Sequence, residues 1–219
     1  MIPARVAAWA AFVLAALASC PAAAAHGGGV PGYTSSVEKV TPAIAGVTVS
    51  VLDGDDRLLL VNGSGRELVI LGYDGEPYLR FAPKGGVYRN ARSPATYRND
   101  DRYGAVELPA QPNPRAAPAW ERVAAGRRFE WHDHRIHWMS EIPPPQVRAD
   151  PDRAHRIFEW EVPGTADGRP FTIEGALDWK PPSSGSPPWL YLALPLCALV
   201  LASSALARLR RRRVGGRAR

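Results

Sequence analysis

Cysteine is scarce in this chain. Its 219 residues include only Cys20 and Cys197, each inside one of two apolar runs near the ends of the sequence. The long central region between those runs has no cysteine, so a disulfide framework is excluded there whatever the redox compartment. The central region must instead be held together by an ordinary hydrophobic core, and its length is sufficient for one.

The central region also lacks the excess positive charge of a nucleic-acid-binding protein. The formal net charge is +6, from 27 basic and 21 acidic residues. Arg5 precedes the first apolar run and seven arginines follow the second, so 27 minus 8 leaves 19 basic residues in between. All 21 acidic residues lie there too, which gives that region a net charge of 19 minus 21, or −2. Nucleic acid is therefore excluded as a partner.

The first apolar run predicts an export signal. Residues 1–25 combine a basic start at Arg5, an apolar stretch too short to span a bilayer easily, and a small-residue end at 23–25. Cleavage after Ala25 would make His26 the new amino terminus. A second interpretation stays open, because residues 17–20 resemble a bacterial lipobox in which Cys20 is lipidated.

The second apolar run predicts a membrane anchor. Residues 181–188 form a Pro/Ser/Gly linker, and residues 189–207 contain no charged side chain. A helix of that length spans about 28 Å, close to the thickness of a bilayer core. The Arg-rich tail 208–219 would stay in the cytoplasm by the positive-inside rule. We expect a single-pass protein of the cell membrane, in contact with the lipid bilayer, whose domain 26–180 lies outside the cytoplasm.

The central domain has the pattern of an all-β protein. Short segments of alternating or apolar residues are separated by Gly, Asp and Pro turns, and no amphipathic helix of useful length interrupts them. This pattern predicts an Ig-like or Greek-key β-sandwich. The expected strands are residues 47–51, 57–62, 66–71, 78–82, 103–108, 127–134, 153–162 and 171–179, and the last two form the clearest hairpin.

The segment 131–139, Trp-His-Asp-His-Arg-Ile-His-Trp-Met, contains three of the five histidines. On a strand, His132 and His134 would leave the same face about 6.5–7 Å apart, a spacing that lets two imidazoles bind one metal ion. A bend after His134 would add His137 and the soft sulfur of Met139. The candidate metal ligands are therefore His132, His134, His137 and Met139, with His26 as a further candidate, and copper is the favoured ion.

Several segments resemble known families. The run 137–139 is similar to copper(I) chaperones of efflux pumps, and an amino-terminal His26 is similar to the histidine brace and to periplasmic copper-resistance (CopC-type) proteins. The chain departs from the latter at Arg169, where their final Asp-Gly-His hairpin has histidine, and in having only Met139 in the mature domain. Segments 53–60, 72–80 and 131–139 together resemble a family of exported, C-terminally anchored proteins of high-GC Gram-positive bacteria. That resemblance implies the same topology and transfers no activity.

A purely structural interpretation of the histidine segment competes with the metal site. Trp131 and Trp138 would be core residues, Asp133 and Arg135 an ion pair, and the histidines members of a hydrogen-bonded network. Catalysis is not expected, because no nucleophile or paired acid accompanies the histidines. Two functions stay open: a non-catalytic cell-envelope module that binds another envelope protein, and a copper-binding accessory protein.

Overall fold

The computed structural model describes residues 29–105 and 112–181. The predicted signal, His26, the linker from residue 182 onward, the predicted membrane helix and the Arg-rich tail lie outside these ranges. Among the described residues, no helix is long and apolar enough to cross a membrane.

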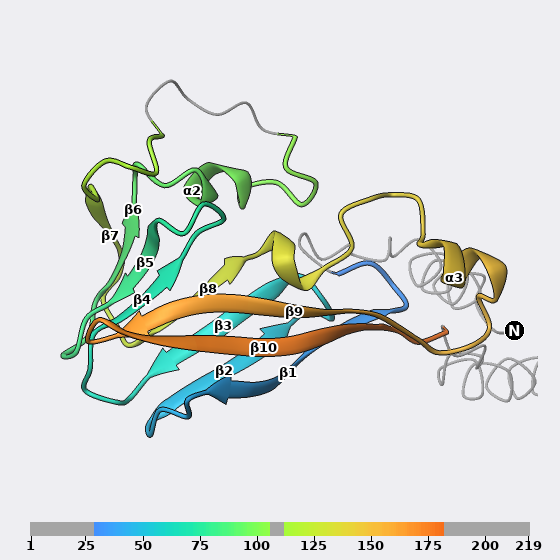
Figure 1. Cartoon of the computed structure of the whole chain (residues 1–219), viewed down its shortest axis with the longest axis horizontal. Coiled ribbons are helices and arrows are strands. Elements are labelled where there is room, and N and C mark those ends of the chain that lie inside the picture. Colours follow the sequence, from blue (N-terminus) through green and yellow to red (C-terminus); the bar gives the residue numbers. More distant parts are fainter. Residues whose placement is uncertain (1–28, 106–111, 182–219) are drawn as a thin grey trace, which may run out of the picture. The chain divides into compact units, whose positions relative to one another are not determined.

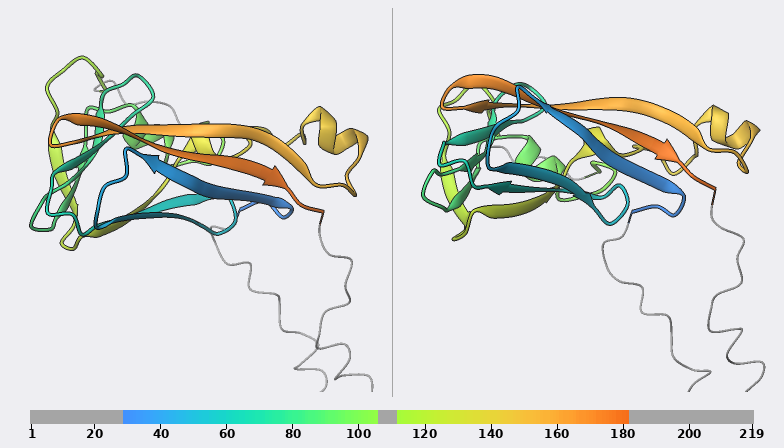
Figure 2. Two further views of the ribbon diagram at one scale, coloured as in Figure 1. Left: turned by 60° about the horizontal axis from the view of Figure 1, so that its bottom comes forward. Right: turned by 90° about the horizontal axis from the view of Figure 1, so that it is seen from below.

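The described residues form ten strands in two antiparallel sheets, which confirms the all-β class (Figures 1 and 2). The larger sheet has the order β1-β10-β9-β4-β5-β6-β7 and the smaller one the order β2-β3-β8. The strands are β1 (Tyr33–Thr41), β2 (Val47–Leu52), β3 (Arg57–Asn62), β4 (Leu68–Leu71), β5 (Pro77–Phe81), β6 (Val87–Asn90), β7 (Trp120–Ala124), β8 (Arg128–His132), β9 (His155–Ala166) and β10 (Arg169–Trp179).

The hairpin predicted near the end of the domain is the longest ribbon of the fold (Figure 1). Strands β9 and β10 pair from Arg169 opposite Ala166 to Trp179 opposite His155. The tight turn between them places Asp167 and Gly168 at positive φ angles of 47° and 78°, which aspartate and glycine tolerate best. Phe171, Ile173 and Leu177 are buried, as the alternation of residues 171–179 predicted, whereas Trp179 is only half-buried and Ala176 is buried as well.

The core lies between the two sheets. Leu58 and Leu60 of β3 are fully buried and belong to the same apolar cluster as Ile173 of β10. The ring centroids of Phe81 on β5 and Trp131 on β8 lie 6.3 Å apart, so an aromatic contact joins the sheets directly. The smaller sheet, and with it β8, is therefore fixed against the larger one.

Several elements differ from the sequence-based expectations. Strands β1, β6 and β7 and the short helices α2 (Ala95–Arg98) and α3 (Pro145–Ala149) were not predicted. The described part of the predicted strand 103–108 is turn and irregular chain. The predicted strand 127–134 ends at His132. Asp133 follows as the cap of the 3-10 turn η1 (His134–Ile136). His132 and His134 therefore do not lie on one face of a single strand, because His134 belongs to the turn.

Candidate metal centre

A buried carboxylate explains why β8 stops at His132. Asp133 caps the turn η1, and its side chain accepts a hydrogen bond from the backbone N–H of Arg135. Its carboxylate also accepts from Trp131 Nε1 at 2.9 Å and from Arg135 Nη2 at 2.7 Å. These local bonds replace continued strand pairing and turn the chain sharply. His137 is thereby brought back toward His132.

Asp133 and Arg135 form the ion pair that the structural interpretation predicted, and the carboxylate of Asp133 is fully buried. Burial by itself would raise the pKa of Asp133, but the guanidinium of Arg135 and the hydrogen bonds hold that pKa below its ordinary value. Arg135 also donates from Nη1 to the carbonyl oxygen of Leu71 at 3.1 Å. The pair therefore stays ionised and fastens the turn to the larger sheet.

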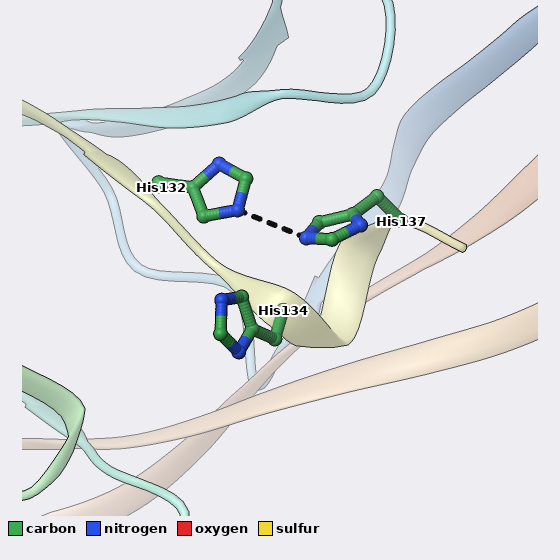
Figure 3. A group of neighbouring side chains, drawn as sticks. All are labelled: His132, His134 and His137. Carbon is green, nitrogen blue, oxygen red and sulfur yellow. Dashed lines mark hydrogen bonds between the residues drawn. The ribbon is translucent and has the colours of Figure 1, made fainter. Parts of the chain in front are cut away.

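The turn gathers three imidazoles into one cluster (Figure 3). His132, His134 and His137 each offer a ring nitrogen, and these three atoms lie within 4.8 Å of one another. The Nε2 atoms of His132 and His137 are only 2.9 Å apart. Tetrahedral ligation with metal–nitrogen bonds of about 2.0–2.1 Å needs nitrogens about 3.3–3.4 Å apart, so a small ring movement would admit an ion.

The closest pair of histidines is oriented by its other nitrogens. His132 Nδ1 lies 3.0 Å from a carboxylate oxygen of Asp56, and His137 Nδ1 lies 3.1 Å from the carbonyl oxygen of Trp138. Both acceptors require a proton on Nδ1, which leaves two Nε2 lone pairs facing each other. A cation placed between the two nitrogens would satisfy both lone pairs. This is the carboxylate–histidine arrangement found around metal ions in proteins.

His134 is held differently from the other two rings. Its Nε2 lies 2.7 Å from the carbonyl oxygen of Asp101, and its ring stacks on Tyr73 at a centroid distance of 5.9 Å. Nε2 therefore already has a hydrogen-bond partner. His134 would act as a third ligand through Nδ1, or by giving up the contact with Asp101. The structure thus pairs His132 with His137, whereas the sequence paired His132 with His134.

Two of the three imidazoles, His134 and His137, have a pKa below the ordinary value of histidine. Burial lowers the pKa of His134, and burial also lowers the pKa of His137 to about 4, with the charge of Arg102 acting in the same direction. A neutral imidazole is the form that binds metal. These two rings are therefore ready to ligate at neutral pH without losing a proton.

An acidic turn supports the cluster, and sequence reasoning missed this role. The segment 53–56 was predicted only as a turn, yet Asp55 is fully buried and accepts from Arg102 Nη2 at 2.7 Å. Arg102 Nη1 also donates to Asp56 at 3.3 Å, so one guanidinium steadies the carboxylate that holds His132. A turn needs only one or two acidic residues. The third carboxylate in Asp-Gly-Asp-Asp was the available signal.

Of the remaining predicted ligands, the structure describes only Met139. Met139 is 41% exposed and lines an open cavity of about 370 Å³ with His134 and His137. His132 lines a second cavity, of about 260 Å³, with Glu130 and Arg57 among other residues. His26 lies outside the described residues. The structure therefore brings together His132, His134 and His137 and places Met139 on the adjoining wall.

No protein-family model, curated protein or solved structure matches this chain.

Proposed function

We propose that this protein is a non-catalytic accessory protein that binds a transition metal, with copper favoured, through His132, His137 and His134. One observation carries the proposal: two Nε2 lone pairs face each other at 2.9 Å, while both Nδ1 atoms are engaged by Asp56 and by a backbone carbonyl. A cation between the two nitrogens satisfies both lone pairs.

The donor set favours copper over harder ions. Three imidazoles suit copper and zinc, whereas magnesium and calcium prefer oxygen ligands. The thioether of Met139 lines the same cavity as two of the rings and is a soft donor that selects copper(I) over zinc. His26 stays a predicted further ligand. His26 precedes Gly29, the first described residue, by three positions. Val30, which follows Gly29, donates its backbone N–H to the carboxylate of Asp55 beside the cluster.

The setting of the domain is part of the same proposal. The signal 1–25, the membrane helix 189–207 and the cytoplasmic tail 208–219 are supported by the sequence pattern. The Ig-like or Greek-key class is supported by the two facing antiparallel sheets. Together they describe a metal-binding domain tethered outside the cytoplasm. The exported, anchored family that the chain resembles supports this topology and no activity.

A cell-envelope interaction module is the second candidate. It is favoured by the exposure of three large apolar side chains, Tyr103 at 37%, Met139 at 41% and Ile142 at 64%. In this case the histidines form only a structural network, in which their ring nitrogens contact Asp56, the carbonyl of Asp101 and the carbonyl of Trp138. Cutting such a buried network costs stability.

Metal titration combined with thermal melts separates the two functions. The full-length protein in detergent should bind one Cu(I) or Cu(II), and His132→Ala with His137→Ala should abolish binding. His155→Ala, which changes an imidazole bonded to the carbonyl of Asp150 outside the cluster, is the matched control and should bind normally. Absence of tight binding by the wild type, with a lower melting temperature for the double variant, would favour the interaction module.

A further inference from the structure

The edges of the two sheets differ in how well they are protected against pairing with another chain. The larger sheet ends in β1 and β7, and the smaller sheet ends in β2 and β8. Proteins usually blunt such edges with charged side chains, proline or bulges, because an edge strand presents unpaired backbone groups. Three of these edges carry charges: Glu38 and Lys39 in β1, Glu121 and Arg122 in β7, and Arg128 and Glu130 in β8. β1 also contains a β-bulge.

Strand β2 has none of these features. Its sequence, Val-Thr-Val-Ser-Val-Leu, contains no charge and no proline, and its pairing with β3 continues without a bulge. Among the described residues, no backbone hydrogen bond joins residues 48–51 to a segment other than β3 (Figure 1). Within the described chain, the outer edge of β2 is therefore open to an added strand.

The core side of β2 is incompletely covered as well. Val49 and Val51 pair with Leu60 and Leu58 of β3, and all four side chains belong to the same apolar core. Both leucines are fully buried, whereas both valines are only half-buried. The difference arises because β3 has a neighbouring strand on each side, and β2 has one on a single side. A strand added beyond β2 would bury the two valines further, which is favourable.

The sequence of β2 fits a second copy of itself. A slip of one residue would turn the valines of one copy away from the core face, so valine must lie opposite valine. In an antiparallel pair with its twofold axis at Val49, Val47 lies opposite Val51 and Thr48 lies opposite Ser50. Every cross-strand pair is then uncharged and contains a β-branched residue, which packs well in sheets.

We propose that this protein forms a symmetric dimer in which two β2 strands pair in this antiparallel register. The pairing joins the two three-stranded sheets into one continuous sheet and does not depend on metal binding. Two short strands fall short of the roughly 1,000 Å² that a stable interface buries, so the dimer is weak in dilute solution. Attachment of both copies to one membrane, as the sequence predicts, favours the dimer by raising the local concentration.

The test measures energy transfer between donor- and acceptor-labelled copies of the full-length protein in lipid vesicles, treated with chelator so that no metal ion bridges two copies. Thr48 and Ser50 are exposed, so charged side chains at these positions leave the fold intact. Thr48→Lys with Ser50→Lys places lysine opposite lysine twice and should weaken the dimer about tenfold. Thr48→Lys with Ser50→Glu places lysine opposite glutamate twice and should pair at least as tightly as the wild type. Ser36→Lys, at an exposed position of β1, is the matched control and should leave the dimer unchanged.

A wild-type protein that stays monomeric at every protein-to-lipid ratio would overturn the proposal and leave β2 to a strand of a different protein. A dimer that responds equally to the two double variants would overturn the register, and a dimer unchanged by both would lie on another surface. Copper titration of these variants should match the wild type, because β2 contains none of the candidate ligands. Failure of the dimer is therefore distinguishable from failure of the proposed metal-binding function.

Discussion

The contact between Asp56 and His132 links two segments that are far apart in the sequence. Asp56 is the last residue of the turn before β3, and His132 ends β8, the neighbouring strand of the smaller sheet. The register pairs Arg57 with His132, which places the carboxylate of Asp56 3.0 Å from Nδ1 of the ring. The sequence around Asp56 and the sequence around His132 do not predict that these two side chains are in contact. The orientation of the ring is a product of sheet pairing.

Asp56→Asn should weaken copper binding while preserving the fold. The amide keeps the shape of the carboxylate but removes the charge that fixes the Nδ1–H tautomer of His132, and loss of such an outer contact typically costs about 10–100-fold in metal affinity. Competition titration against a chelator of known affinity measures the change. Glu130→Gln is the matched control, because it removes an exposed carboxylate that also contacts Arg57. Equal affinities for Asp56→Asn and the wild type would contradict the assigned role of Asp56.

The metal-free protein should lose stability as the pH falls from about 6.5 to about 4. Burial lowers the pKa of His137 to about 4, and Arg102, His132 and His134 face the same ring. A histidine in the unfolded chain titrates near 6.5, so between these values the unfolded state binds more protons. The loss amounts to about 3 kcal/mol at most. Thermal unfolding of chelator-treated protein across this range measures it, and His137→Gln should show a shallower dependence. Parallel curves for the two proteins would contradict the assignment.

The histidine segment shows how far one element can be predicted from sequence. Trp131 was expected in the core, and Asp133 with Arg135 was expected as an ion pair; both are confirmed. Trp138 was also expected in the core, but it is only half-buried at the edge of the apolar cluster. The convergence of the imidazoles was expected through a bend after His134, yet the turn starts one residue earlier. The cause is the Asp133 carboxylate, which binds the following backbone N–H and ends the strand at His132. Local side-chain competition of this kind is invisible to a two-residue periodicity.

Strand prediction failed where periodicity was weak. Val87–Asn90 and Trp120–Ala124 are short strands at the far edge of the larger sheet, and each mixes charged and aromatic residues without a clean apolar face. Their pairing with β5 and with each other comes from tertiary contact. The long hairpin β9–β10, by contrast, carries a clear alternation and a turn signal, and it was predicted from both.

Gly175→Ala should destabilise that hairpin strongly. A methyl group at Gly175 would lie 2.2 Å from the carbonyl oxygen of Ser36 and 2.2 Å from Trp160 Cζ2. The indole cannot move away easily, because it is buried and donates from Nε1 to Ser35 Oγ at 2.8 Å. Overpacking of this kind costs about 1–3 kcal/mol. Melting temperatures measure it against Gly126→Ala, where a methyl group meets nothing within 4 Å. A melting temperature equal to that of the control would show that β1 and β10 adjust freely.

For the whole molecule, the sequence and the structure are informative about different parts. Composition separates a nearly neutral central region from basic, apolar ends, because charge distribution needs no knowledge of folding. The all-β class follows from strand periodicity in the same way. The candidate centre does not follow from periodicity, because Asp56, Arg102 and the imidazoles come into contact only when two sheets and a loop are assembled. The sequence pattern therefore does not predict which side chains from different strands and loops come into contact.

The predicted membrane topology can be tested on the whole chain with reporter fusions. A reporter that is active only outside the cytoplasm should work when inserted near Gly104 and should fail when placed after Arg213. The reason is energetic: moving the arginine-rich tail across a bilayer is costly for each charge, whereas residues 189–207 contain no charge and cross readily. A cytoplasm-specific reporter at the same two positions is the control and should give the opposite result. Export activity after Arg213 would overturn the orientation, and the candidate metal centre would then face a reducing compartment in which copper(I) is the available oxidation state.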